Sequence, residues 1–535
     1  MEIRWAMNTD KKKFLANRRD FLKRITSLAF SFKPLSIFAA NNTNAKNSIQ
    51  RWMLASHRIH PMTKLIPFRN ETYCKSTSAI FTTTPDYSIS KLKLSFSNWV
   101  TLSTGVQKPE VDGPAPIKVK GAIFVDGTIF AKLTFKGKDK VSINPGGDVW
   151  CDEVKVPQWI GRNIEIRTYC ETKLGVPRPV SYRNRESSAR DAVIYDTNDA
   201  RHLALLNGQE EVLIKKYRPY FYGPSLMVSN GWDGRHVILC VGDSIGYGNN
   251  FGSSWLTNAI DDKQGLRLPY ANFCVQGTRA SGQSSLKEGA YRRKTALLSS
   301  VNANPAFPPF TCVLSQMGVN DAWGNDGKKL LNKMQKWWAF IKEQWPSTIL
   351  VQTTYTPKCA KDKVNYYTNY PSQQSVTTTP PDADRWYVAD IIKTVPSPLD
   401  SFIDVREAWT GNKTGHLWRQ LNYTGRLTKG LAKADTTCVV DNAPPMGGAI
   451  VFSAGTSEKK AELPYAVITK IEGTGPYKVT FSNPVTKRHP IGSSVKVTMS
   501  RDGTHPFGRY ANQFALQEVL NFKVKKLSKI KHHQY

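Results

Sequence analysis

The stretch from Val237 to Gly248 has the sequence Val-Ile-Leu-Cys-Val-Gly-Asp-Ser-Ile-Gly-Tyr-Gly. Its first five residues are apolar and partly β-branched, which predicts a buried strand at 237–241. The strand leads directly into Gly242-Asp243-Ser244, so Ser244 is expected on the turn that follows it. Because reacting groups gather at the carboxyl ends of strands in open α/β sheets, this stretch predicts an enzyme with Ser244 as a candidate nucleophile.

Two other interpretations fit the same stretch. A glycine turn followed by a serine helix cap would need no chemistry. A dinucleotide-binding loop would also place glycines after a strand, but Gly246-x-Gly248-x-x-x-Gly252 departs from the G-x-G-x-x-G spacing. These three interpretations can be distinguished by the rest of the sequence, because only a serine nucleophile needs catalytic partners downstream.

Strand and helix patterns alternate after this stretch, which predicts a parallel sheet with helices on both faces. A helix is expected over 328–345, because five large apolar residues fall on one face. Asn325 or Asp326 could cap its start, and Pro346 ends it. Strands are expected at 237–241, 271–275, 311–315, 348–352 and 402–405.

Two other parts of the chain have β patterns. Residues from about 88 to 185 have a β pattern: strand-like runs flank Asp126-Gly127, which predicts a hairpin, and 164–170 alternates apolar and polar residues, so a β-sandwich-like domain is expected over 88–230. Four short strand-like runs between 441 and 499 predict a small β-module inserted into the α/β domain.

A serine hydrolase also needs a histidine base, a carboxylate to orient it, and donors for the oxyanion. The spacing Asp-x-x-His occurs at Asp199/His202, Asp233/His236 and Asp502/His505. His236 begins the strand that leads to Ser244, about 25 Å away at the wrong end. The first pair precedes the α/β domain, whereas Asp502/His505 could lie over the carboxyl edge of the sheet.

Four blocks in order resemble those of the SGNH (GDSL) hydrolase family, which includes carbohydrate esterases. Gly242-Asp243-Ser244 resembles the first block, Asn272 to Gly277 the second, Gly318-Val-Asn320-Asp321 the third and Asp502-x-x-His505 the fourth. Gly282 also follows the second block, so its glycine is not fixed by the sequence alone. A helix cap at Asn320-Asp321 and a turn at Asp502-Gly503 would explain single blocks but not their order.

The resemblance implies a fold and roles for these residues. The fold would be an SGNH-type three-layer α/β/α domain with a parallel sheet. Ser244 would be the nucleophile, His505 the general base and then acid, and Asp502 the residue that orients His505. The backbone N–H groups of Ser244 and Gly277 and the side-chain amide of Asn320 would form the oxyanion hole. No cofactor is expected, and no Cys/His spacing suggests a metal.

The N-terminus suggests export. Asn17-Arg-Arg-Asp-Phe-Leu-Lys23 precedes a short apolar run and resembles a twin-arginine signal, with cleavage near Ala39-Ala40. An organellar transit peptide and a basic disordered arm are the alternatives. The apolar run is too short to span a bilayer, and no later stretch approaches 18 apolar residues. A periplasmic or extracellular protein without a transmembrane segment is therefore expected.

The expected organisation follows from these patterns. It comprises an export signal (1–40), a linker (41–87), a β-rich accessory domain (88–230), the hydrolase domain (231–440 and 500–526), the inserted β-module (441–499) and a basic tail (527–535).

The cysteines allow two interpretations. Cys151 with Cys170 and Cys359 with Cys438 could form disulfides in an exported protein. Cys240, Cys274 and Cys312 lie on apolar strands, where buried thiols are expected.

Composition and blocks together predict an exported serine esterase that removes O-acyl, chiefly O-acetyl, groups from a carbohydrate. The formal net charge of +32 favours an anionic glycan or surface as a partner, and no nucleic-acid motif is present. A glycan-binding surface adhesin with a non-catalytic hydrolase fold is the alternative from another class. A lipase or thioesterase is an enzymatic alternative, although no amphipathic lid is visible.

Overall fold

The protein is described by a computed structural model in which Met1–Gln50 and Arg51–Tyr535 form two compact units. The predicted export signal, Cys359 and the candidates Asp502 and His505 lie outside the described residues. The described residues all belong to the second unit: 51–56, 59, 62–66, 74–102, 110–182, 191–212, 220–247, 255–262, 267–284, 291–304, 306–322, 326–357, 381–410, 423–452, 466–486, 488–498, 500 and 508–530.

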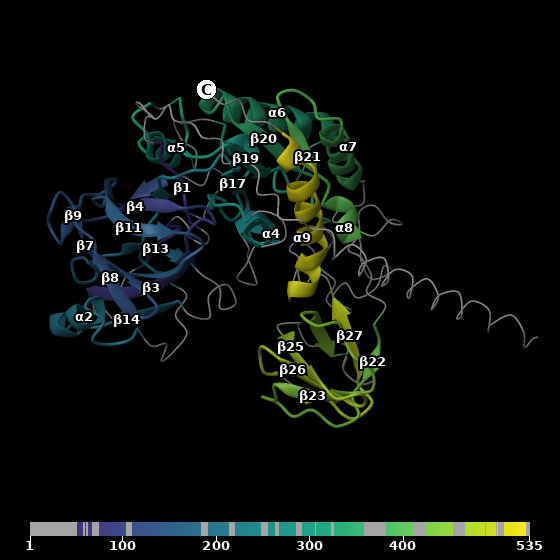
Figure 1. The fold of residues 1–535 in the computed structure, drawn as a ribbon. Coiled ribbons are helices and arrows are strands. Elements are labelled where there is room, and N and C mark those ends of the chain that lie inside the picture. The colour runs from purple at the N-terminus through teal and green to yellow at the C-terminus, as the bar shows by residue number, and fades with distance from the viewer. Residues whose placement is uncertain are drawn as a thin grey trace, which may run out of the picture. The chain divides into compact units, whose positions relative to one another are not determined.

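A five-stranded sheet carries the stretch that begins at Val237 (Figure 1). Each pair of neighbours is parallel. The residues of the three inner strands are all buried, as is typical of parallel strands covered on both faces. The order across the sheet is β18 (Tyr270–Asn272), β17 (Ile238–Gly242), β19 (Cys312–Gln316), β20 (Ile349–Thr353) and β21 (Ser401–Ile403).

The helices beside this sheet form two contacting groups. In one, α9 (Gly508–Lys525) packs against α4 (Trp255–Asp261) and α8 (Arg406–Thr410); in the other, α6 (Gly327–Gln344) packs against α7 (Pro381–Lys393). Asp326, one of the two caps that the sequence allowed, caps α6 by accepting a hydrogen bond from the Lys329 N–H. The remaining helices here are α3 (Ser244–Tyr247), η1 (Ala280–Gly282), α5 (Arg292–Ser299) and η3 (Leu527–Lys529).

Helix α6 is joined to the sheet by two buried indoles. Trp337 Nε1 donates to Ser315 Oγ over 3.0 Å, and Trp338 Nε1 donates to Gln352 Oε1 over 3.1 Å. Each indole thus buries a large apolar area while its N–H keeps an acceptor. The two bonds fix the helix against the ends of β19 and β20.

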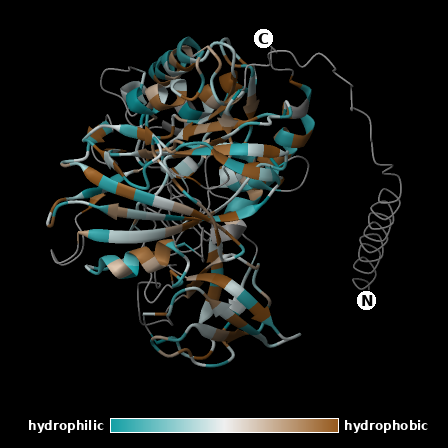
Figure 2. Ribbon diagram, turned by 60° about the vertical axis from the view of Figure 1, so that its left-hand side comes forward, coloured by the Kyte–Doolittle hydropathy of each residue, from teal (hydrophilic) through white to brown (hydrophobic). Residues whose placement is uncertain are grey.

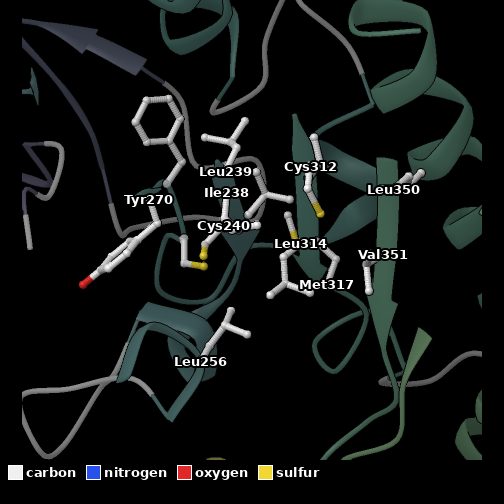
Figure 3. Packing of buried hydrophobic residues seen from close by; sticks show 14 of the residues in the cluster. Ile238, Leu239, Cys240, Leu256, Tyr270, Cys312, Leu314, Met317, Leu350 and Val351 are labelled. Carbon is white, nitrogen blue, oxygen red and sulfur yellow. The ribbon is translucent and has the colours of Figure 1, made fainter. Parts of the chain in front are cut away.

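The hydrophobic cluster of this region includes three cysteines. Figure 3 shows Cys240 and Cys312 among Leu314, Leu350 and Val351. Burial raises the pKa values of the Cys240, Cys274 and Cys312 thiols, which are therefore protonated and act as small apolar side chains. The prediction of buried thiols is confirmed.

Two antiparallel sheets N-terminal to this region enclose a second hydrophobic cluster. One contains β1 (Met53–Leu54), β16 (Leu226–Ser229), β4 (Ile89–Ser97), β10 (Asp148–Trp150) and β11 (Val154–Trp159). The other contains β14 (Ala192–Tyr195), β3 (Lys75–Thr83), β12 (Asn163–Glu171), β7 (Ile117–Val125), β8 (Thr128–Lys132) and β9 (Val141–Ile143). Figure 2 shows hydrophobic and hydrophilic residues alternating along several of these strands.

Smaller elements complete this β-rich region. They are β2 (Lys64–Ile66), β13 (Arg178–Tyr182) and β15 (Tyr220–Phe221), the pair β5 (Trp99–Thr101) and β6 (Glu110–Asp112), and helix α2 (Asp199–Leu206). The predicted hairpin is confirmed: Val125 pairs with Thr128, and Asp126 and Gly127 between them have φ values of 51° and 79°. A positive φ at both turn residues is the reason that Asp-Gly suits this turn.

The predicted linker at 41–87 is wrong over its described part. Residues 75–83 form β3, which pairs with β12 on one side and β14 on the other. This central strand buries Ser76, Thr77 and Ser78 in succession before Ala79 and Ile80, so it lacks the expected alternation of hydropathy. Because many of its buried side chains carry hydroxyl groups, the sequence pattern did not indicate a buried strand here.

The two disulfides that the sequence allowed are not formed. Cys151 and Cys170 are buried free thiols, and Cys438 is free as well. Burial raises the pKa of Cys151 to about 11 and that of Cys170 to about 12, so both remain protonated. Their role is that of small core residues.

A six-stranded antiparallel sheet with its own hydrophobic cluster lies between α8 and α9 in the sequence. It begins earlier than the expected boundary at 441, because residues 437–440 pair with residues 477–480 and 425–426 pair with 494–495. The order is β22 (Gly425–Arg426), β27 (Ser494–Thr498), β24 (Ala449–Phe452), β25 (Ala466–Glu472), β26 (Tyr477–Phe481) and β23 (Thr437–Val440). Among the described residues, no helix combines the length and the hydrophobicity that are needed to span a membrane.

Buried charges join β6 to α5. The Glu110 carboxylate accepts hydrogen bonds from the backbone N–H groups of Arg293 and Lys294 at the start of the helix. The Lys294 side chain is fully buried, and its Nζ donates to the Phe273 carbonyl over 3.4 Å. Burial raises the pKa of Glu110, and the positive charge of Lys294 opposes that effect.

Lys294 generates a prediction about pH. Burial lowers its pKa from 10.5 to about 8, although attraction to Glu110 acts in the opposite direction. Between these two values the unfolded chain holds more protons than the folded protein, so Lys294 should make the free energy of unfolding rise with pH. The rise should be on the order of 3 kcal/mol.

Urea unfolding at pH 8 and pH 10.5 measures this effect. In the double variant Glu110→Gln, Lys294→Met, the increase in the free energy of unfolding should be smaller by about that amount. In Lys173→Met, which removes an exposed lysine, the increase should equal that of the wild type. Equal pH dependence in all three proteins would show that Lys294 keeps its ordinary pKa.

Candidate active site

Ser244 is the first residue of α3, directly after β17. Its exposed fraction is only 8%, so the hydroxyl lies in a largely enclosed position. The preceding Asp243 is fully buried and shapes the turn: its Oδ1 accepts from the Ile245 N–H over 2.8 Å, and its carbonyl accepts from Tyr247 over 2.9 Å. The serine is therefore held on a sharp strand-to-helix turn.

Gln316, the last residue of β19, supports this turn from the neighbouring strand. Its buried Oε1 accepts from the Gly246 N–H over 2.8 Å and approaches the Asp243 N–H at 3.4 Å. Glycine is needed at 246 because a Cβ there would lie 2.7 Å from Cys274 Sγ and 3.0 Å from Gln316 Oε1. Sequence analysis missed Gln316; an amide that ends an apolar strand just before Gly318 was the available signal.

A second loop continues from β18 beside the nucleophile strand. Phe273 N–H donates to the Cys240 carbonyl, and Val275 N–H donates to the Gly242 carbonyl over 2.9 Å. Gly277 follows with a φ of 71°, a conformation that favours glycine. No described residue accepts a hydrogen bond from its N–H, whereas the N–H of the alternative, Gly282, donates to Arg279.

A third loop, after β19, connects the first two. Asn320 Nδ2 donates to the Thr278 carbonyl over 3.1 Å and to Asp243 Oδ2 over 3.3 Å. It therefore touches the residue before Ser244 and the residue after Gly277. The loop turns at Gly318, whose φ of 118° and contact with Tyr355 exclude a side chain.

Asp321 anchors the loop of Gly277 independently. Its carboxylate is 1% exposed and accepts from the N–H groups of Ala280, over 2.6 Å, and Ser281, over 3.0 Å, at the start of η1. Burial raises the pKa of Asp321, and these two hydrogen bonds partly oppose the shift. The sequence included Asp321 in a block but assigned it no contact.

The structure thus brings Ser244, Gly277 and Asn320 to one edge of the sheet through hydrogen bonds between their neighbours. The other two Asp-x-x-His pairs are elsewhere. His202 lies on α2 in the β-rich region, and His236 Nε2 contacts the Leu527 carbonyl at the opposite end of β17. Across the described residues, His, Cys, Asp and Glu nowhere form a group of three suited to a metal.

Comparisons with known proteins give a limited result. No family model matches the sequence, and no curated protein does. Among solved structures, similarity is found to a family two carbohydrate esterase from Clostridium thermocellum in complex with cellohexaose, at 12% identity and a TM-score of 0.24, over 65% of this chain and 88% of that one.

Two further solved structures are similar to the same extent. A putative GDSL-like lipase from Bacteroides ovatus has 12% identity and a TM-score of 0.22, over 64% of this chain and 77% of that one. An acetyl xylan esterase from the rumen bacterium Butyrivibrio proteoclasticus has 9% identity and a TM-score of 0.24, over 67% and 87%.

Asp321→Asn should destabilise the protein. The amide would place an N–H₂ group against one of two backbone donors, leaving that donor without an acceptor in a buried position. The free energy of unfolding should fall by about 1–3 kcal/mol. Asp326→Asn is the matched control, because asparagine caps a helix as well as aspartate does. Equal stability of the two variants in urea would contradict the anchoring role.

Gly246→Ala should cost about 1–3 kcal/mol, because its Cβ would overlap Cys274 Sγ and Gln316 Oε1. Adding Cys274→Ala removes the nearer atom and should restore part of the loss, which a double-mutant cycle by thermal or urea unfolding measures. Gly430→Ala is the control, since the nearest atom to its Cβ would lie at 3.8 Å. Additive effects of Gly246→Ala and Cys274→Ala would show that the sulfur does not restrict this site.

Proposed function

We propose that this protein is a serine ester hydrolase of the SGNH type that removes O-acyl, chiefly O-acetyl, groups from a carbohydrate. The observation that carries the proposal is the Asn320 amide, which contacts both the Ser244 turn and the Gly277 loop at the carboxyl ends of parallel strands. A serine beside convergent donors is the arrangement that acyl transfer requires. A helix cap or a glycine turn would not require these contacts between loops.

The proposed reaction has two stages. Ser244 Oγ attacks the ester carbonyl while His505, oriented by Asp502, accepts the hydroxyl proton. The tetrahedral intermediate then expels the sugar alkoxide, which receives that proton and leaves as the alcohol. His505 then takes a proton from water, whose oxygen attacks the acyl-serine. The second tetrahedral intermediate breaks its bond to Ser244 Oγ, which takes the proton back from His505, and the carboxylic acid is released.

The oxyanion of each intermediate would be stabilised by three donors. Gly277 has an N–H without an acceptor among the described residues, which suits this role. One Asn320 N–H is held by Thr278, and the other makes the longer contact to Asp243. That second N–H would turn from Asp243 to the oxyanion as negative charge develops. The Ser244 N–H would be the third donor.

The carbohydrate substrate and the export of the protein are parts of the same proposal. The net charge of +32 would attract an acidic polysaccharide, and the twin-arginine pattern would place the enzyme outside the cytoplasm. A lipase or thioesterase would instead favour long acyl chains. A comparison of acetyl, butyryl and octanoyl esters separates these substrates, since an acetyl esterase should lose activity as the chain lengthens.

Asn320→Ala should reduce kcat for p-nitrophenyl acetate on the order of a hundredfold or more, because loss of one oxyanion donor costs about 2.7–4 kcal/mol in the transition state. KM should change little. Ser244→Ala should abolish both this reaction and acetate release from acetylated polysaccharides. Asn442→Ala, which removes an exposed amide on the bend that follows β23, is the control and should retain full activity.

Two results would contradict the proposal in different ways. Full activity of Asn320→Ala with an inactive Ser244→Ala would remove Asn320 from the oxyanion hole but retain the nucleophile. Wild-type protein as inactive as Ser244→Ala on all these esters, with glycan binding retained, would favour the non-catalytic glycan-binding protein.

A further inference from the structure

A second site lies in the β-rich region. A pocket of about 260 Å³ opens beside β7, β12 and α2, and its lining contains Lys140, Tyr169, Glu171, Asp199, His202 and Leu203. Its volume is slightly below the usual range of ligand pockets, so it suits a single small ring better than a long chain. None of the residues of the candidate active site belongs to it.

The floor of this pocket is held in a fixed arrangement. His202 Nε2 lies 3.1 Å from the Asp196 carbonyl, which can only accept, so this nitrogen carries the proton. Nδ1 then accepts from Thr77 Oγ1 over 2.8 Å. The His202 and Tyr169 rings meet edge to face at 5.3 Å. Both nitrogens of His202 thus have hydrogen-bond partners within the protein. The two rings form a rigid floor of the pocket, and His202 is not placed to act as a catalytic base.

The charged residues of the pocket lining and their ion-pair partners are four lysines and three carboxylates, which leaves one positive charge in excess. Three lysines are paired with carboxylates: Lys75 with Asp199 at 2.8 Å, Lys118 with Glu171 at 2.9 Å and Lys120 with Asp139 at 3.1 Å. Lys140 is exposed and attracts the neighbouring Asp139 carboxylate, which is already paired with Lys120, but no described residue forms an ion pair with the Lys140 ammonium group. The rim therefore offers one ammonium group to a ligand, together with carboxylate oxygens that can accept hydrogen bonds.

The apolar part of the lining is also open to a ligand. Leu203 is 49% exposed on α2 although it is a large hydrophobic residue, and Leu206 lies one turn further along the same helix. Such a surface suits the C–H face of a sugar ring, whereas a phosphate or sulfate would gain nothing from it. The two rim carboxylates would also repel a compact anion.

We propose that this pocket binds one uronic acid residue of an anionic polysaccharide. The sugar carboxylate pairs with Lys140, its hydroxyls donate to Asp199 and Glu171, and its apolar face lies on Leu203. A neutral sugar would leave Lys140 unmatched, and a simple anion would leave the carboxylates and Leu203 unmatched. This inference goes beyond the proposed hydrolysis and does not depend on it.

The test measures binding of a galacturonic acid trimer by calorimetry, in a Ser244→Ala background so that no turnover occurs. Lys140→Glu and Leu203→Asp should each weaken binding of the acidic trimer at least tenfold. Lys138→Glu is the matched control: it makes the same change of charge two residues away, is exposed, and does not line the pocket. It should change the dissociation constant less than twofold, and added salt should weaken binding to the unmodified pocket.

Each other outcome overturns the inference. Equal weakening by Lys140→Glu and Lys138→Glu would indicate nonspecific attraction to a basic surface. Retained binding in Lys140→Glu and Leu203→Asp would place the glycan site elsewhere, and equally tight binding of a neutral galactose trimer would exclude recognition of the acid. Unchanged near-ultraviolet circular dichroism confirms that the variants are folded, so loss of binding is not loss of structure. Esterase activity is not a readout, so this test remains valid if the proposed function fails.

Discussion

The hydrogen bonds of Asn320 and Asp321 are the constraint on which the candidate site depends. These two neighbouring residues contact both other loops at the edge of the sheet: Asn320 bonds to Asp243 and Thr278, and Asp321 bonds to Ala280 and Ser281. Because Asp321 is buried, loss of its acceptors would leave backbone donors without water or protein partners. The turn after β19 therefore fixes the distance between Ser244 and the Gly277 loop. This distance must be small if donors from both loops are to bind the same oxyanion.

The order of the strands makes this constraint possible. Strand β17 lies between β18 and β19 and is parallel to both, so the loops after all three strands leave at one edge. Close packing then restricts the residue types: a side chain at Gly246 would overlap Cys274 and Gln316, and Gly318 has a φ that other residues rarely adopt. The glycines in these blocks are thus explained by backbone approach and conformation, while the polar residues beside them supply the contacts.

The sequence was sufficient to predict the elements whose buried faces consist of apolar residues. The five strands of the parallel sheet were predicted within two or three residues, and the cap of α6 is Asp326, one of the two residues that the sequence allowed. Strand β3 was missed because its interior positions hold serine and threonine. Gln316 was missed because its role depends on a contact between strands, and no pattern along one strand shows that. The roles of Asp502 and His505 stay predictions.

Contacts with the β-rich region extend the same constraint away from the site. Glu110 on β6 accepts hydrogen bonds from the backbone N–H groups of Arg293 and Lys294 in the first turn of α5. The Arg293 side chain donates to Asp112 and to the Gly146 carbonyl. Lys294 on the same helix donates to the Phe273 carbonyl, four residues before Gly277. A displacement of β6 would therefore move α5 and the strand that leads into the Gly277 loop. The bonds of Glu110, of Gly146 and of Lys294 are buried or partly buried and involve charged groups, so breaking them costs more than breaking an exposed ion pair such as Arg293 with Asp112. The β-rich region thus contributes to the geometry of the candidate site as well as carrying a pocket of its own.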